Sequence, residues 1–131
     1  MRLKILVIED NEQNMYLMTF LLEKNGFDVI QAREAEQGIV LAAERKPDLI
    51  LLDIQLPDMD GYTVAKKLRA DPVSAGIPII AVTSYAMLGD REKSLASGCS
   101  AHIEKPIDPD TFLDQISGYL PPRSAAEGGR S

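Results

Sequence analysis

The sequence is poor in cysteine and in basic side chains. Cys99 is the only cysteine, so no intrachain disulfide can form, and a reducing compartment suits the chain. We interpret Cys99, which follows Gly98, as a small residue in a turn. Lys and Arg number 14 against 20 Asp and Glu, which gives a net charge of -6. This balance argues against wrapping nucleic acid, because neutralising phosphates requires clustered basic residues.

Long hydrophobic runs, glycine-rich loops and histidine are also scarce. The first apolar run ends at Ile8, before Glu9, and is too short for a signal peptide or a membrane span. No glycine-rich loop follows it, which argues against a bound nucleotide. The single histidine, His102, makes a zinc site improbable. We therefore expect a cytoplasmic protein with no membrane partner.

What remains is an ordinary globular composition, with 45% hydrophobic and 26% charged residues in 131. We expect one domain over residues 1–120. The Pro-, Ser- and Gly-rich residues 121–131 lack apolar periodicity and predict a disordered tail. Such a tail is too short for an output domain that binds DNA or catalyses a reaction.

Short apolar runs alternate with amphipathic segments along the chain. This pattern predicts an α/β fold, a doubly wound (βα)5 sandwich with helices on both faces of a parallel sheet. The start of the fourth helix stays open between Ala86 and Asp90. The last helix is expected to have Asp108 as its N-cap and Pro109 as its first residue. The predicted strands are 3–8, 28–31, 48–52, 77–82 and 101–104, and the other predicted helices are 11–25, 35–46 and 62–70.

Polar residues follow four of these strands where each one ends. They are Glu9 with Asp10, then Asp53, Thr83, and Lys105 before Pro106. Because the carboxyl ends of parallel strands share one edge of a sheet, we expect these side chains to converge. Three converging carboxylates would raise one another's pKa values unless a cation lay between them. Mg²⁺, a hard cation with oxygen ligands, fits that requirement.

The same residues suggest phosphoryl chemistry. A carboxylate held rigidly at the sheet edge, as Asp53 would be, can attack phosphorus to give an acyl phosphate. The ammonium of Lys105 would neutralise phosphoryl oxygens, and the hydroxyl of Thr83 would donate a hydrogen bond. Pro106 would aim Lys105 inward, and we expect a cis bond there.

Over residues 3–120 these motifs resemble the receiver domain of two-component response regulators, the CheY-like superfamily. Glu9 to Asn14 and Thr83 to Met87 are most similar to single-domain regulators of the DivK type and to receivers of hybrid kinases. The resemblance implies a flavodoxin-like sheet in the order 2-1-3-4-5. It also implies a signalling switch rather than an enzyme, one that catalyses only its own phosphorylation and slow dephosphorylation.

The resemblance implies a role for each site residue. Asp53 would accept a phosphoryl group from a histidine kinase or a phosphotransfer protein, and Thr83 and Lys105 would hold that group. Mg²⁺, or Mn²⁺ in its place, would bind Asp10, Asp53 and the backbone carbonyl of Gln55 directly, and Glu9 through water. The fourth helix, the fifth strand and the fifth helix would form the surface that binds a downstream protein. The chain would be a monomer or a weak dimer.

Two positions concern tuning of the switch. Many receivers carry Tyr or Phe three residues before the family lysine, where this chain has His102. His102 is either a half-exposed strand residue or a switch residue that makes signalling pH-dependent. Gln55 and Tyr85 lie where receivers tune hydrolysis of the acyl phosphate, and we expect Tyr85 to shield the phosphoryl group.

Three other interpretations stay open at this point. Phosphohydrolases with an aspartate nucleophile use an Asp-x-Asp motif, but position 55 is Gln. A flavodoxin-like binding module would share the sheet topology. A fragment of a hybrid kinase is compatible with the tail, although the Met1 start disfavours it.

Overall fold

A computed structural model describes residues 2–84, 92 and 96–121. The sheet has five parallel strands in the order β2-β1-β3-β4-β5, so the predicted fold class and strand order are confirmed. The strands are β1 (Lys4–Ile8), β2 (Asp28–Ala32), β3 (Leu49–Asp53), β4 (Ile79–Thr83) and β5 (Ala101–Glu104).

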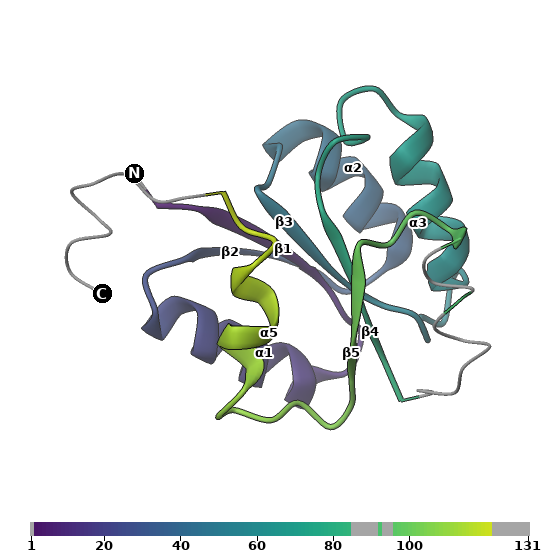
Figure 1. Cartoon of the computed structure of the whole chain (residues 1–131). Coiled ribbons are helices and arrows are strands. Elements are labelled where there is room, and N and C mark those ends of the chain that lie inside the picture. The colour runs from purple at the N-terminus through teal and green to yellow at the C-terminus, as the bar shows by residue number, and fades with distance from the viewer. Residues whose placement is uncertain (1, 85–91, 93–95, 122–131) are drawn as a thin grey trace.

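Helices cover both faces of the sheet (Figure 1). The described helices are α1 (Glu12–Lys24), α2 (Ala35–Arg45), α3 (Gly61–Ala70) and α5 (Phe112–Ser117). The predicted fourth helix, with its start at Ala86 or Asp90, falls largely outside the described residues, as do residues 122–131 of the predicted tail. No helix in the described part of the chain is long and apolar enough to cross a membrane.

Each face of the sheet builds its own hydrophobic core. Leu6 and Leu52 point toward α2 and α3, whereas Val7 and Leu51 point toward α1 and α5. β3 and β4 are buried along their whole length, as expected for central strands covered on both sides. The carboxyl ends of these strands are therefore fixed by packing on two faces.

Local signals in the sequence explain most helix boundaries. The side chain of Asn11 accepts a hydrogen bond from the backbone N–H of Asn14 and so caps α1. After α1, Gly26 has the predicted left-handed backbone, with φ of 89°. Helix α2 ends at Arg45, two residues before Pro47, because Lys46 adopts a left-handed conformation with φ of 46°.

The start of the last helix differs from the prediction. The side chain of Asp108 does accept a bond from the Asp110 N–H, but residues 109–111 form a turn and α5 begins at Phe112. The backbone N–H of Thr111 bonds to the carbonyl of Asp108, three residues back, and thereby closes that turn. The N-cap of α5 is Thr111, whose side chain makes no capping bond, so both the predicted N-cap, Asp108, and the predicted first helical residue, Pro109, were wrong.

Candidate metal and phosphoryl site

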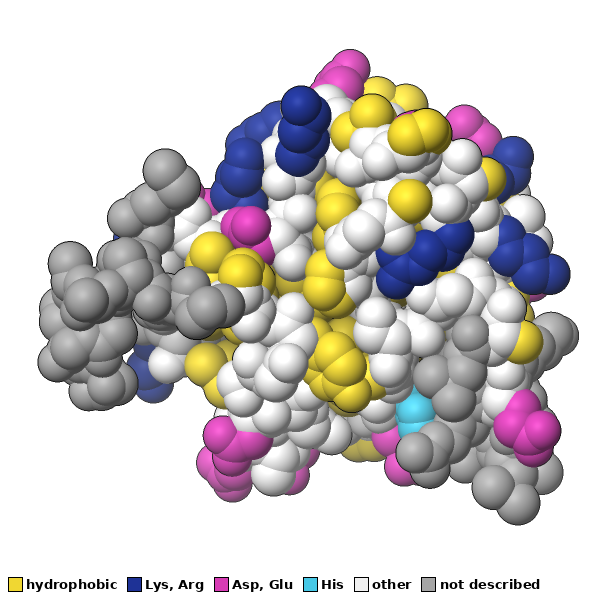
Figure 2. Space-filling view, turned by 45° about the horizontal axis from the view of Figure 1, so that its top comes forward, with side chains coloured by type: hydrophobic (Ala, Val, Ile, Leu, Met, Phe, Trp, Pro, Cys, Tyr) yellow, Lys and Arg dark blue, Asp and Glu magenta, His cyan; other side chains and the backbone are white. Residues whose placement is uncertain are grey.

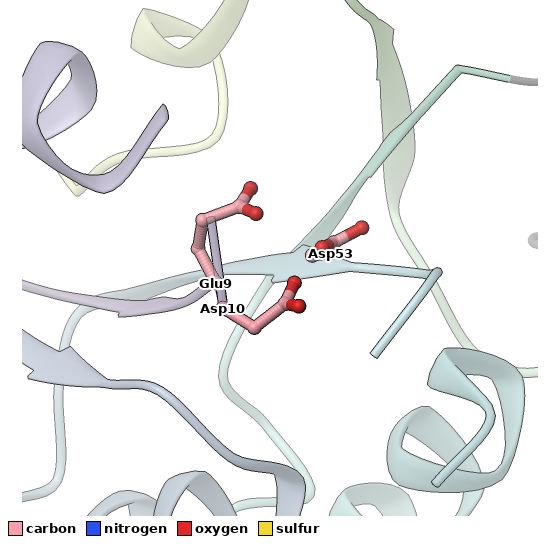
Figure 3. A group of neighbouring side chains, drawn as sticks. All are labelled: Glu9, Asp10 and Asp53. Carbon is pink, nitrogen blue, oxygen red and sulfur yellow. The ribbon is translucent and has the colours of Figure 1, made fainter. Parts of the chain in front are cut away.

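An acidic cluster occupies the carboxyl edge of the sheet. Glu9 and Asp10 follow β1, and Asp53 is the last residue of β3, next to β1 in the sheet. One carboxylate oxygen of each lies within 4.8 Å of those of the other two. Figure 3 shows the three side chains directed toward a common space. Glu9 and Asp53 are buried, whereas Asp10 is exposed.

Lys105 joins this cluster from the end of β5. Its Nζ lies 3.3 Å from Asp53 Oδ1 and 3.4 Å from Glu9 Oε1. The backbone N–H of Lys105 donates to the carbonyl of Thr83, so the ends of β4 and β5 are joined beside the site. The Lys105–Pro106 peptide bond is cis.

The cluster carries more negative charge than its cation balances. Burial, and then the nearby Asp53, raise the pKa of Glu9 to about 7 from 4.5, although Lys105 acts in the opposite direction. The pKa of Asp10 is also raised, by partial desolvation and by Asp53. Protonation or a bound cation would therefore relieve the site.

The site has the features that a hard divalent cation requires. Glu9 Oε1 is fully buried and has no hydrogen-bond partner among the described residues, because Lys105 approaches it as an ion pair without hydrogen-bond geometry. A buried carboxylate oxygen without such a bond is costly unless a cation compensates it. The donors are all carboxylate oxygens, which Mg²⁺ prefers. The residues present thus fit Mg²⁺.

The other residues predicted for the site lie at the same edge or beyond the described chain. Thr83 ends β4 and is buried. The Gln55 N–H donates to Asp53 Oδ1, and the Gln55 side chain accepts from the Ser84 N–H at 3.3 Å. His102 is a partly buried residue of edge strand β5 and is visible at the surface in Figure 2. Tyr85 lies outside the described residues.

Two residues that the sequence did not single out shape this edge. Asp58 accepts hydrogen bonds from the backbone of Ala35 and Glu36, which lie at the start of α2. Gly61 leaves no room for a side chain, since an added Cβ would lie 2.4 Å from Ile54 Cα. This close approach brings the start of α3 against the backbone that follows Asp53. A glycine just before the predicted helix start at residue 62 was the available signal.

The sheet and the acidic edge together define a flavodoxin-like α/β domain with a candidate cation site. The sequence matches the response regulator receiver domain family over residues 5–117. The chain belongs to this family.

Relatives support the same assignment. The polar-differentiation response regulator DivK of Brucella anthropi is 45% identical over 116 residues, which cover 88% of this chain and 94% of DivK. A receiver domain protein from Methanospirillum hungatei superposes with a TM-score of 0.84 at 29% identity, over the whole of both chains. The receiver domain of the sensor histidine kinase PA1611 from Pseudomonas aeruginosa has a TM-score of 0.83 at 30% identity, over 91% of this chain and 98% of that one. That structure carries a magnesium ion coordinated in its active site cleft.

The family excludes the rival interpretations based on an enzyme or a flavin module. The chain is a response regulator receiver of two-component signalling, not an enzyme of metabolism. Receivers of this family act as phosphoacceptors, and the acidic cluster found here can bind a metal.

Proposed function

We propose that Asp53 is the phosphoacceptor of this receiver. The observation that carries the proposal is the position of its carboxylate, which is 2% exposed and lies 3.3 Å from the Lys105 ammonium. In the reaction an Asp53 oxygen forms a bond to phosphorus, while the bond from phosphorus to the donor breaks and the donor keeps the electron pair. The donor is a histidine kinase or a histidine phosphotransfer protein.

The surrounding side chains prepare Asp53 for this reaction. The Gln55 N–H holds Asp53 Oδ1 in place at 2.9 Å. Lys105, which approaches the same oxygen, neutralises charge that the phosphoryl group brings. Thr83, buried at the end of the neighbouring strand, donates its hydroxyl to a phosphoryl oxygen.

We propose that Mg²⁺ is the cofactor, with Mn²⁺ able to replace it. Asp10, Asp53 and the backbone carbonyl of Gln55 bind it directly, and Glu9 binds it through water. When bound, the cation offsets the negative charge of carboxylates and phosphoryl oxygens. Support comes from the raised pKa of Glu9 and from the magnesium ion in the PA1611 receiver.

The signal leaves through protein contacts. The proposed surface comprises the fourth helix, β5 and α5, and it binds a downstream protein when Asp53 is phosphorylated. The backbone bond between Lys105 and Thr83 connects β5 to the site. A bias of about 1–3 kcal/mol between two states of this surface is enough for signalling. His102 reports the state of the site at this surface, and Gln55 and Tyr85 set the lifetime of the acyl phosphate.

Intact-mass measurement after incubation with acetyl phosphate and Mg²⁺ tests the proposal. Wild type gains the mass of one phosphoryl group, and Asp53→Ala gains none. Asp114→Ala, which removes an exposed carboxylate on α5, is the matched control and is modified like wild type. Modification of Asp53→Ala to the wild-type extent would refute the assignment, and omission of Mg²⁺ tests the cofactor.

A further inference from the structure

The segment between β3 and α3 carries Gln55 and needs to be held in place. Residues 55–60 have no regular secondary structure, and Gln55, Pro57, Asp58 and Asp60 are exposed. The side chains of Ile54 and Leu56 are anchored in the core beside α2 and α3. The polar contacts of the segment determine the position of its exposed backbone.

Asp58 connects this segment to a helix distant in the sequence. Its two carboxylate oxygens each lie 3.0 Å from the Ala35 N–H nitrogen, and one lies 3.4 Å from that of Glu36. The N-cap residue of α2, Glu34, makes no capping bond with its own side chain. Asp58 therefore supplies the cap of α2 from another part of the chain.

The electrostatics agree with this geometry. The hydrogen bond from Ala35 lowers the pKa of Asp58, so the carboxylate stays ionised near neutral pH. A negative charge at the start of a helix is also favoured by the helix dipole. The contact is therefore maintained at neutral pH.

The contact is one link in a series of bonds that runs from Glu9 to Asp53. The Glu9 N–H donates to the carbonyl of Ala32, the last residue of β2. Three residues later, Ala35 donates to Asp58. From Asp58 the chain returns to Gln55, whose N–H donates to Asp53. Loss of Asp58 would break this series between α2 and the segment that carries Gln55.

We propose that Asp58 is a positioning residue for metal binding, because it fixes the segment with the Gln55 carbonyl against α2. The inference rests on the proposed function, in which that carbonyl is a ligand. Asp58 itself does not touch the metal. A segment freed from α2 must be ordered again when the cation binds, and this ordering weakens affinity.

Mg²⁺ titrations by calorimetry test this role with three variants. We expect Asp58→Ala to bind Mg²⁺ roughly tenfold more weakly than wild type, as is typical when a residue that orients a metal ligand is lost. Asp58→Asn keeps an acceptor oxygen and should stay within about threefold of wild type. Glu34→Ala removes a carboxylate beside the same helix start without removing a capping bond, and it should stay within about twofold.

Amide hydrogen exchange in the metal-free protein separates positioning from simple capping. Positioning predicts that Asp58→Ala speeds exchange at Gln55 as well as at Ala35. A purely structural cap would lower the melting temperature and speed exchange at Ala35 alone, with Mg²⁺ affinity unchanged, and that result would overturn the inference. Equal weakening by Asp58→Ala, Asp58→Asn and Glu34→Ala would also overturn it, because charge alone would then explain the effect. A wild type that neither binds Mg²⁺ nor accepts a phosphoryl group would instead refute the proposed function, and the inference with it.

Discussion

The carboxyl edge of the sheet, where its strands end, and the amino edge, where they begin, differ in how buried charge is balanced. At the carboxyl edge, the fully buried Glu9 faces Asp53, and Lys105 is shared between the two carboxylates. At the amino edge, the partly buried guanidinium of Arg69 donates three hydrogen bonds to backbone carbonyls. One edge holds charge that a ligand can relieve, whereas the other satisfies its charge within the fold. The candidate site and the internally satisfied charge of Arg69 thus lie at opposite ends of the strands.

The contacts of Arg69 explain why the amino edge is stable. Its guanidinium lies 2.9 Å from the carbonyls of Gly98 and Ala75 and 2.6 Å from that of Ile77. Gly98 precedes β5, and Ala75 and Ile77 precede β4. One side chain of α3 therefore binds the backbone just before each of two strands. Cys99 is buried beside it, and burial raises the pKa of its thiol to about 11.

The largest expected effect is a pH dependence of stability that Glu9 causes at the carboxyl edge. The pKa of Glu9 in the folded protein, about 7, lies above its unfolded value of 4.5, so the metal-free folded state binds more protons between these limits. The free energy of unfolding therefore falls as pH rises through this range, by roughly 3 kcal/mol in total. Glu9→Gln should remove this fall, because glutamine does not titrate.

Urea unfolding in EDTA at pH 5 and pH 8 measures this effect. Wild type and the control Glu44→Gln, an exposed site on α2, should both lose stability at pH 8. If Glu9→Gln lost as much stability between pH 5 and pH 8 as wild type, Glu9 would not be the group that causes the pH dependence. Addition of Mg²⁺ at pH 8 should restore wild type more than Glu9→Gln.

Arg69→Ala tests the opposite edge. The substitution leaves carbonyl groups of the strand entrances without their donor and should lower the free energy of unfolding by about 2–3 kcal/mol. Lys67→Ala, an exposed basic residue of the same helix, should change it by less than about 0.5 kcal/mol. If Arg69→Ala were as stable as Lys67→Ala, the stability of the amino edge would not depend on Arg69.

Gly98→Ala tests how closely Arg69 packs against the backbone at the amino edge. Gly98 has φ of 105°, and an added Cβ would lie 2.6 Å from Arg69 Cγ. We expect a loss of about 1–2 kcal/mol from backbone strain and crowding together. Gly118→Ala, at a C-cap with φ of -68° and open space around it, should be nearly neutral.

The double variant separates the two causes. When Gly98→Ala is combined with Arg69→Ala, the alanine at position 98 no longer meets the arginine side chain. The substitution at position 98 then costs only its backbone strain. The combined loss should therefore be smaller than that of the two single variants together. Strict additivity would mean that the alanine methyl group never met the arginine.

The sequence allowed the sheet and the acidic cluster to be predicted, because both follow from local patterns. β3 is an uninterrupted apolar run, and Asp53 ends it, so its position at the sheet edge required only the rule for parallel strands. Glu9 and Lys105 follow from the same rule. Their proximity in the structure confirms that the three strand ends converge.

Contacts between segments far apart in the sequence could not be predicted in this way. Asp58 caps α2, which begins 23 residues earlier, and such a cap leaves no local signature. Arg69 reaches Gly98 across 29 residues for the same reason. The predicted start of α5 was wrong because Asp108 caps a turn as readily as a helix. Local patterns specified the elements and the site, and tertiary contacts specified how the site is held.

The smallest expected effect concerns Gln55. Its side chain accepts from the Ser84 N–H at 3.3 Å in an exposed position, so solvent can replace this bond. Gln55→Ala should lower the free energy of unfolding by less than about 0.5 kcal/mol, like Gln115→Ala on the exposed face of α5. Urea unfolding at pH 7 measures both variants. A loss above about 1 kcal/mol for Gln55→Ala alone would mean that a polar contact at the carboxyl edge stabilises the fold as Arg69 does, and the contrast between the edges would then fail.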